Sequence, residues 1–589
     1  MRRHPLVLQD TYKQYTYDLD KVCPPEETVA RVRQRFQRLH LDILKKTLRI
    51  DSGRLDIPVY VSLCGMDAVR TIGTQKQMGK GSTPIQAEAS ALMELVERFS
   101  FFAFMQQRAF LYATPGSLVE EAVPFKTLVK SLFDTSDTVP VAAELYRDWP
   151  LHFTAATNLT YGHRVLLPIH WFYLINEYNG PAAGNTLEEA ILQGLCEVVE
   201  RHVGSVISHG RLFTPVIDPA SVQDPAAREL LDKFQAQGII LHLRDFSLDT
   251  GIPTVGVLAY DPSTFPEASE LIFTAGTTPH PEKSLIRALT EVAQLAGDFN
   301  KRTSYRPTLP KYATLTEASY LMTAGPPRPI QSLPNLSHDN IKTEIERCTG
   351  ALARLGLEVF VVDATHPEIG IPVVYVIIPG AHFLERTRQT NVVFHLAKLA
   401  SQFAAPEDAL EALERLNERL PGRFDVLFFL GLALDNLGRT HEAVAAFEAS
   451  LQAKPPAQEL ASVYVHLGSC LKDLGDYAGA IAALQLAQNA NDQLKEVYHL
   501  LGFCYFKRKE HQRAVECFEK AIELDPGSGI DYANLGINLR ELGYRPEAAH
   551  LLRIALELDP SLEFARLALE DLEGRQGGGA AEAGRNRSD

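Results

Sequence analysis

Residues 79–100 read GKGSTPIQAEASALMELVERFS, a stretch that predicts one long helix with a defined beginning. Thr83 is suited to the N-cap and Pro84 to the first helical position. Gln86 stands three residues after Thr83, which is the spacing of a capping box. The Gly-Lys-Gly before it could bind an anion at the helix N-terminus, but a plain flexible loop is at least as good an interpretation. We therefore expect a helix that starts at Pro84.

One face of this helix carries Ser90, Glu94 and Glu97, which lie four and three residues apart. For any single Glu-x-x-Glu, a solvated face with ion pairs is the simplest interpretation. Here the surrounding residues are apolar, and a buried carboxylate is unfavourable unless it is paired with a cation or bound to a metal. Carboxylate oxygens with few histidines nearby suit Mg²⁺ rather than zinc, and Mg²⁺ usually accompanies phosphate.

The pattern returns in AGNTLEEAILQGLCEVVERHV, where Thr186 begins a second helix. One stripe of this helix is polar and consists of Glu189, Gln193, Glu197 and Glu200. Arg201 follows directly. A weaker third copy is PEKSLIRALTEVAQL, in which Arg287 and Glu291 lie four residues apart and Gln294 replaces the second carboxylate. Three helices are therefore expected to build one site, with arginines that bind phosphate oxygens.

Together with DIPVYVSL near the start and DATHPEIGIPVVYVIIPGAHF at the close, these stretches resemble the YcaO superfamily over roughly residues 25–385. The resemblance implies a mixed α/β (α+β) domain that binds ATP without a P-loop. It also implies an enzyme that phosphorylates the oxygen of a peptide backbone amide. A nucleophile then attacks the activated carbon: a Cys, Ser or Thr side chain gives an azoline, sulfide gives a thioamide, and an amine gives an amidine.

The resemblance also implies roles for individual residues. The nucleotide would be bound by Ser90, Glu94, Asn185, Gln193, Glu197, Arg201 and Arg287. Mg²⁺ would be held by Glu94, Glu97, Glu189, Glu200 and Glu291. Arg201 and Arg287 would contact phosphate and take part in catalysis. Structural roles are the alternatives: Glu189 could cap its helix, Arg201 could pair with Glu197, and Arg98 could be structural.

The chain departs from the azoline-forming members of the superfamily because it continues into repeats and lacks their Pro-rich x-P-x-P end. This departure argues against azoline formation. Thioamide formation, amidine formation and assistance to another modifying enzyme, such as a ribosomal-protein methylthiotransferase, stay open. No fused leader-peptide module is visible in the sequence, so a recognition partner is expected to be a separate chain.

A repeat begins at about residue 405. Leu-Gly pairs recur at intervals of 37, 34 and 34 residues, at Leu430-Gly431, Leu467-Gly468, Leu501-Gly502 and Leu535-Gly536. This pattern is similar to the tetratricopeptide repeat, a 34-residue helix–turn–helix. The second unit departs at Asp492, where a Pro would stand. We therefore expect a YcaO-like domain at 1–385, a linker at 386–404, an all-α solenoid at 405–573 and a disordered tail at 574–589.

Such a solenoid has a concave face that takes peptides or helices, so it is expected to hold a substrate protein, a partner protein or a second copy in a homodimer. Its tyrosines have two interpretations, as lining of that groove or as packing between helices; they are Tyr464, Tyr498, Tyr505 and Tyr532. Two further interpretations of the whole chain stay open. One is a binding scaffold with a degenerate nucleotide site, and the other is a metal-dependent hydrolase that does not use ATP.

Length and composition exclude several classes of protein. At 589 residues the chain is too long for one core. A net charge of −15 argues against a general binder of nucleic acid or of anionic membranes. No apolar run approaches the roughly 20 residues of a membrane helix, and the N-terminus shows no secretory signal. Seven scattered cysteines without a CxxC pair indicate reduced thiols and a cytoplasmic location.

Overall fold

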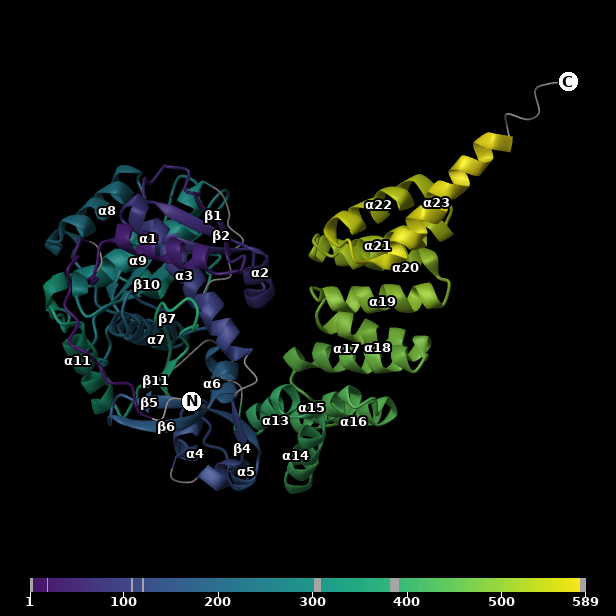
Figure 1. Cartoon of the computed structure of the whole chain (residues 1–589), viewed down its shortest axis with the longest axis horizontal. Coiled ribbons are helices and arrows are strands. Elements are labelled where there is room, and N and C mark those ends of the chain that lie inside the picture. Colours follow the sequence, from purple (N-terminus) through teal and green to yellow (C-terminus); the bar gives the residue numbers. More distant parts are fainter. Residues whose placement is uncertain are drawn as a thin grey trace. The chain divides into compact units, whose positions relative to one another are not determined.

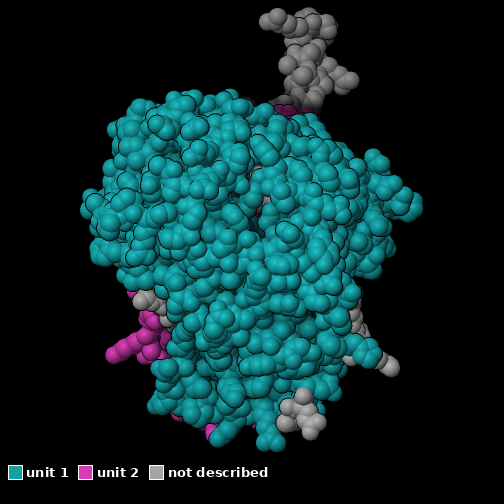
Figure 2. All heavy atoms as spheres, turned by 90° about the vertical axis from the view of Figure 1, so that its left-hand side faces the viewer, with its two compact units in different colours: residues 1–392 teal, residues 393–589 magenta. Residues whose placement is uncertain are grey.

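The computed structural model describes residues 4–17, 20–106, 110–118, 121–300, 309–381 and 391–582. The chain divides into two compact units, residues 1–392 and residues 393–589. Figure 1 traces the secondary structure of both units, and Figure 2 shows the atoms of the first as one closely packed body. We describe each unit by itself.

Unit 1 contains three sheets, and every strand pairing among its described residues is antiparallel. The first has the order β1-β2-β3, with bounds Leu44–Arg49, Val59–Cys64 and Lys76–Lys80. The second has the order β10-β9-β8, with bounds Ile272–Thr277, Thr254–Tyr260 and Ile240–Asp245. The third has the order β4-β5-β11-β12-β7, with β6 paired to β5. Its strands are β4 Leu111–Ala113, β5 Leu151–Asn158, β6 His163–Pro168, β7 Pro181–Ala183, β11 Phe360–Asp363 and β12 Val373–Ile377.

The helices of unit 1 surround these sheets. They are α1 Pro25–Arg38, α2 Met66–Ile72, α3 Pro84–Met105, α4 Phe125–Val129, α5 Val139–Arg147, α6 Ile169–Asn176, α7 Leu187–Gly210, α8 Pro225–Ala236, α9 Pro281–Ala296, α10 Ser319–Met322 and α11 Ile341–Arg354. Short 3-10 turns lie at Pro115–Leu118, Pro219–Ser221, Gly297–Phe299 and Ile330–Ser332. This mixed architecture confirms the predicted fold class.

Each of the three helices that carry the polar pattern packs on a different part of the sheets. Helix α3 contacts β2 and β3, helix α9 contacts β9 and β10, and helix α7 contacts β7, β12 and β10. Helix α3 also contacts β7, and α9 contacts β3 (Figure 1). The three helices are thereby drawn together although they are about a hundred residues apart in the sequence.

A glycine lets the backbone of each helix approach its strand closely. A side-chain Cβ at Gly79 of β3 would lie 2.0 Å from the backbone N of Ala91 in α3. A Cβ at Gly276 of β10 would lie 2.2 Å from the backbone O of Ser284 in α9. Gly184 follows β7, and its Cβ would lie 2.3 Å from a backbone N of α7. No side chain fits at these positions, so glycine sets the distance between helix and strand.

Two apolar clusters bury the nonpolar faces of α7 and α9. Helix α7 contributes Ile191, Leu195 and Val199 to a core shared with β12 and α11. Helix α9 contributes Leu285 and Leu289 to a second core shared with β9 and α8. The apolar stripe of each helix is buried in this way, and its polar stripe is left to face the opposite side.

Unit 2 is entirely helical. Its helices are α13 Val392–Phe403, α14 Pro406–Arg419, α15 Phe424–Asn436, α16 Thr440–Gln452, α17 Ala457–Asp473, α18 Tyr477–Ala490, α19 Lys495–Lys507, α20 His511–Leu524, α21 Gly529–Glu541, α22 Arg545–Leu558 and α23 Glu563–Glu582. From α15 to α22 they pair as the predicted repeats. The Gly of each Leu-Gly pair lies against a large side chain of the next helix, as Gly431 does against Phe447 and Gly502 against Phe518.

Two segments of unit 2 differ from the sequence-based division. Helix α13 lies in the stretch predicted as a linker, because Val393, Leu396 and Ala400 recur at helical spacing and are buried. Helix α23 continues through residues 574–582 of the predicted tail, and residues 583–589 lie outside the described residues. The boundary between the units lies at residues 392 and 393.

Tyrosines in the repeats contribute to packing. Tyr498 and Tyr505 are buried, and Tyr464 and Tyr532 are partly buried against the apolar clusters. The hydroxyl of Tyr498 donates to the backbone O of Asp492 over 3.0 Å. This hydrogen bond holds the exit turn of the second repeat, where the sequence lacks the usual Pro.

Candidate functional site

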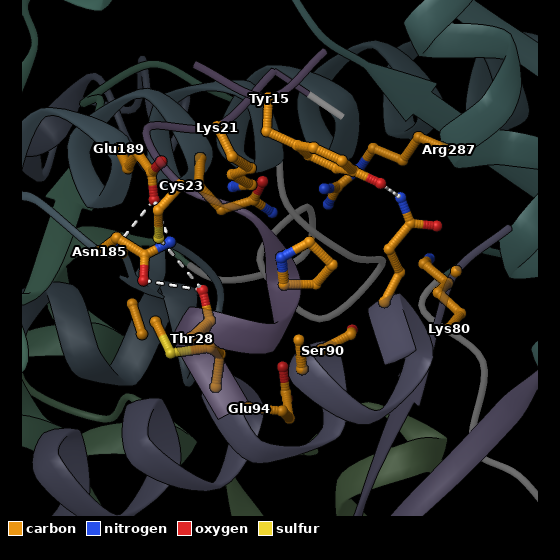
Figure 3. A pocket seen from close by; sticks show the side chains of 18 of the residues that line it. Tyr15, Lys21, Cys23, Thr28, Lys80, Ser90, Glu94, Asn185, Glu189 and Arg287 are labelled. Atoms are coloured by element: carbon orange, nitrogen blue, oxygen red, sulfur yellow. Dashed lines mark hydrogen bonds between the residues drawn. The ribbon is translucent and has the colours of Figure 1, made fainter. Parts of the chain in front are cut away.

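Helices α3, α7 and α9 converge on one cavity of about 170 Å³, with α1 and the N-terminal segment on its other side. This is roughly ten times the volume that a single water needs on the same measure. Among the predicted site residues, the cavity is lined by Ser90, Glu94, Glu97, Asn185, Glu189, Gln193 and Arg287. Figure 3 shows that the labelled side chains come from all of these elements and point toward a common space. The sequence pattern therefore marks a single site.

Helix α3 begins as the sequence predicts and presents its polar face to the cavity. Thr83 accepts a hydrogen bond from the backbone N of Gln86, and the Gln86 side chain accepts one from the backbone N of Thr83. Ser90 and Glu94 lie on the cavity wall one and two turns beyond Gln86. The capping box thus fixes where the helix starts and which residues reach the cavity.

Arg98 supports the two carboxylates of α3. Its Nε donates to Glu94 Oε1 over 2.8 Å, and an Nη lies 3.5 Å from Glu97 Oε1. Another Nη donates to the backbone O of Tyr178 over 3.0 Å. Arg98 does not line the cavity. These contacts support the interpretation of Arg98 as a structural residue.

Glu97 is a buried carboxylate among other carboxylates. Burial raises the pKa of Glu97 well above its usual range, and Glu94 and Glu197 raise it further. Arg98 opposes this shift. Burial also raises the pKa of Glu197, against the effect of Arg201 and Arg98. A cation in the cavity would stabilise the ionised form of these groups.

At the start of α7, Glu189 is held by three N–H donors. Its Oε2 accepts from the backbone N and the side-chain Nδ2 of Asn185, at 2.8 and 3.0 Å. Its Oε1 accepts from the backbone N of Val22 over 2.6 Å. Thr186 caps the backbone N of Glu189, so half of the predicted capping box forms, while the Glu189 carboxylate binds Asn185 instead. Glu189 therefore orients Asn185 and the N-terminal segment (Figure 3).

Further along α7, Glu200 is completely buried behind the cavity wall. Its Oε2 accepts from Arg287 Nε over 2.9 Å and from the backbone N of Thr277 over 3.0 Å. Its Oε1 lies 3.1 Å from Arg201 Nη1. Glu200 thus places the guanidinium of Arg287, which lines the cavity, and that of Arg201, which lies behind it.

Glu291 of α9 pairs with Lys80 at the end of β3. Burial opposes the ionisation of Glu291, but Lys80 and Arg201 outweigh it and hold the pKa at about 2. Lys80 itself lines the cavity. The Gly-Lys-Gly motif, for which a plain loop was at least as good an interpretation, therefore contributes a cation to the site.

The sequence pattern did not predict the side of the cavity formed by the N-terminal segment and α1. It consists of Tyr15, Lys21, Cys23, Pro25 and Thr28. Thr28 donates to Asn185 Oδ1 over 2.9 Å. These residues follow no helical or strand periodicity that points to a site, so only the folded chain reveals them.

A sequence model described as YcaO cyclodehydratase, ATP- and Mg²⁺-binding, matches residues 78–382, just over half of the chain. The chain belongs to the YcaO family. Three tetratricopeptide models match the second unit of this YcaO protein, at residues 395–458, 461–493 and 496–528. Both matches confirm the resemblances drawn from the sequence, and ATP and Mg²⁺ are the cofactors of the family.

Curated relatives share the YcaO part. An uncharacterized protein of Methanothermobacter thermautotrophicus is 29% identical over 385 residues, which cover 60% of this chain and 93% of the relative. An uncharacterized protein in the tfuA 3′ region of Rhizobium leguminosarum bv. trifolii is 27% identical over 61% of this chain and 88% of the relative. The ribosomal protein S12 methylthiotransferase accessory factor YcaO of Escherichia coli is 32% identical over 23% of this chain and 22% of the relative.

Two solved structures share the fold. A heterocyclase in complex with substrate and cofactor has a TM-score of 0.52 at 26% identity, covering 64% of this YcaO protein and 54% of the heterocyclase chain. The YcaO of Methanopyrus kandleri, bound with AMPPCP and Mg²⁺, has a TM-score of 0.50 at 24% identity. It covers 65% of this YcaO protein and 98% of that chain. This YcaO protein spans about half of the heterocyclase.

The residues present fit Mg²⁺ and a phosphate chain. The guanidinium of Arg201 is buried, and among the described residues neither its Nε nor its Nη1 makes a hydrogen bond, although Nη1 forms an ion pair with Glu200 Oε1. Such buried donors are suited to phosphate oxygens. The described residues contain no group of three or more His, Cys, Asp or Glu placed to hold a metal ion by themselves. Mg²⁺ commonly binds one or two carboxylates together with phosphate, so this arrangement suits a metal that arrives with its nucleotide.

Across the described part of the chain, no helix combines the length and apolar character that crossing a membrane requires.

Proposed function

We propose that this YcaO protein uses ATP and Mg²⁺ to activate a backbone amide of a peptide or protein for attack by a nucleophile. The observation that carries the proposal is the convergence of α3, α7 and α9 on one cavity, with carboxylates on its wall and arginines on or behind it. ATP supplies the phosphoryl group that makes the amide oxygen a good leaving group. The residues of this chain position the reactants and neutralise charge.

The geometry supports a division of roles among the predicted residues. Glu94, Glu97 and Glu189 line the cavity and would hold Mg²⁺. Ser90, Asn185 and Gln193 lie beside them as polar contacts for the nucleotide. Arg287 and Arg201 would bind phosphate oxygens, and Lys80 adds a third cation. Glu200 and Glu291, which were predicted as metal ligands, form ion pairs with these cations and would orient them. Glu197 does not line the cavity, and its charge interacts with Arg98 and Arg201.

Several reactions fit this chemistry. A heterocyclase among the similar structures supports ring formation, and the accessory factor of Escherichia coli supports assistance to a protein-modifying enzyme. Thioamide or amidine formation would use the same activated amide. The tetratricopeptide unit is proposed to hold the peptide or protein substrate, a separate partner protein or a second copy of the chain. We propose that the protein works in the cytoplasm, because all seven cysteines are free thiols.

The test measures phosphate release from Mg²⁺–ATP with and without candidate peptides, in the wild type and in the variants Glu94→Ala and Arg201→Ala. Each variant should lose turnover by about a hundredfold or more, as expected for the removal of an electrostatic contact to the reacting phosphate. Glu88→Ala is the matched control, since Glu88 lies on the same helix but contacts Arg33 and Thr47 outside the cavity. Turnover that both site variants retain, or a wild type that binds no ATP, would refute the proposal.

A further inference from the structure

The backbone of the N-terminal segment is anchored at Tyr15 and at the two residues that follow it. The backbone N of Tyr15 donates to the backbone O of Lys21 over 3.0 Å, and the backbone N of Lys21 donates back to Tyr15 over 2.8 Å. Lys283 of α9 donates to the backbone O of Thr16 and Tyr17, at 2.9 and 2.6 Å. The position of the Tyr15 backbone is therefore tied to α9.

The side chain of Tyr15 forms part of the cavity wall. It is the only aromatic residue among those of the described chain that line the cavity. Arg287 lines the same cavity, and in the view of Figure 3 Tyr15 and Arg287 lie away from Glu189 and Asn185. The orientation of this ring therefore affects the shape of a cavity that Arg287, a residue proposed to bind phosphate, also lines.

Gln86 fixes the orientation of the Tyr15 ring. The Oε1 of Gln86 accepts from the backbone N and Oγ1 of Thr83, at 3.0 and 2.9 Å. Because an amide oxygen must face these donors, the amide nitrogen faces the other way. That nitrogen donates to the Tyr15 hydroxyl over 2.6 Å. The Gln86 side chain is buried, and both its amide oxygen and its amide nitrogen form hydrogen bonds within the protein.

Gly81 leaves the space that Gln86 occupies. A Cβ at Gly81 would lie 2.7 Å from Gln86 Cβ and 2.8 Å from the backbone N of Ala87. The second glycine of the Gly-Lys-Gly motif thus allows the amide to lie between Thr83 and Tyr15. A capping box requires only the acceptor oxygen of residue 86. The donor nitrogen bonds the Tyr15 hydroxyl in addition.

We propose that Gln86 is a positioning residue for nucleotide binding, which holds the Tyr15 ring as a wall of the cavity and joins the N-terminal segment to the start of α3. The proposal rests on the ATP- and Mg²⁺-binding of the family, and it does not depend on which reaction follows. It assigns two separate tasks to one amide: the oxygen begins the helix, and the nitrogen closes one side of the nucleotide cavity.

The experiment is isothermal titration of the full chain with Mg²⁺–ATP. Tyr15→Phe keeps the ring and the capping box but removes the acceptor for Gln86. It should weaken ATP binding about three- to tenfold, which corresponds to one net hydrogen bond. The melting temperature should change little, and any ATP hydrolysis should show a raised KM with an unchanged kcat. Gln86→Ala should weaken binding at least as much and also lower the melting temperature, because the cap is lost as well.

Asp476→Ala is the control for loss of a cap alone, since Asp476 caps α18 in the repeats. It should lower stability without changing ATP affinity. ATP binding by Tyr15→Phe with the affinity of the wild type would overturn the inference and leave Gln86 as a helix cap only. If ATP binds and Tyr15→Phe weakens it, but no peptide stimulates phosphate release, the inference stands while the proposed reaction fails.

Discussion

Charged side chains in this YcaO protein are buried with partners that lie far away in the sequence. Lys80 and Glu291 are 211 residues apart, and Glu200 and Arg287 are 87 apart. Each buried charge pays a desolvation cost that its partner offsets, and removal of one partner leaves the other uncompensated. The partners at the cavity therefore serve both the stability of unit 1 and the placement of its cations.

Glu291→Gln should destabilise unit 1 by about 3–5 kcal/mol near pH 7, because Lys80 loses its buried partner. The folded pKa of Glu291 is about 2, below its ordinary value of 4.5. Its stabilising contribution is therefore present above pH 4.5 and is lost as the pH falls toward 2. Urea unfolding of the wild type and the variant at several pH values checks this. A difference that stays constant from pH 6 to pH 3 would contradict it.

Glu97→Gln should stabilise the protein without nucleotide at high pH, whereas Glu291→Gln destabilises it. Since the folded pKa of Glu97 is raised, its contribution is present below its ordinary value of 4.5 and is lost as the pH rises through the folded pKa. At pH 8 the neutral amide should be more stable than the wild type, because the buried carboxylate of the wild type must ionise. Thermal unfolding with a chelator at pH 5 and pH 8 measures the difference in stability between the variant and the wild type. This difference should increase with pH. Titration with Mg²⁺–ATP should show weaker binding by the variant.

At the scale of elements, three helices are placed by three glycines. Gly79, Gly184 and Gly276 each allow a helix backbone to lie against a strand or its end, without space for a side chain. The polar faces of α3, α7 and α9 meet only if all three approaches are kept. Shifts of about an ångström in these helices would therefore change the positions of the polar side chains around the cavity.

Gly276→Ala should displace α9, because the new Cβ would lie 2.2 Å from the Ser284 backbone O and 2.6 Å from the Ala288 backbone N. We expect a loss of about 1–3 kcal/mol in the free energy of unfolding and weaker ATP binding, since Arg287 moves with the helix. Gly350→Ala in α11 is the matched control, because nothing lies within 4 Å of its added Cβ. The control should be neutral or stabilising by up to about 1 kcal/mol. Equal stabilities of the two variants would show that the close approach is not needed.

At the scale of the whole molecule, each unit has its own core and its own task. Apolar clusters form within residues 1–392 and within residues 393–589. The cavity proposed to bind the nucleotide is lined by residues of unit 1. Among the tyrosines of the repeats, Tyr498 and Tyr505 are buried between helices, whereas Tyr464 and Tyr532 are partly buried and Tyr544 is exposed.

Residues 1–391 expressed alone should fold and bind Mg²⁺–ATP with the affinity of the full chain, within about twofold. Residues 392–589 should fold alone as a helical protein. If the repeats hold the substrate, the first fragment should require about a hundredfold more substrate for the same rate, because the tethered binding site is lost. Circular dichroism, ATP titration and substrate-dependent phosphate release measure these three properties. An unchanged substrate requirement would show that the repeats serve another partner.

The sequence by itself determined the local structure and the residue types of the site. The capping box of Thr83 and Gln86, the helix faces of Ser90 and Glu189, and the period of the repeats all depend on neighbours within one or two turns. The structure confirmed the predicted fold class, and the family match confirmed the resemblance.

Only the tertiary structure decided how these residues divide their work. It placed Glu94, Glu97 and Glu189 on the cavity wall. Glu200 instead pairs with Arg287 and Arg201, and Glu291 pairs with Lys80. The tertiary structure also brought Tyr15 to Gln86, a contact that no periodicity predicts. The physical reason is that the pairing of buried charges and the filling of a cavity depend on long-range packing, whereas helix starts and helix faces depend on the nearest residues in the chain.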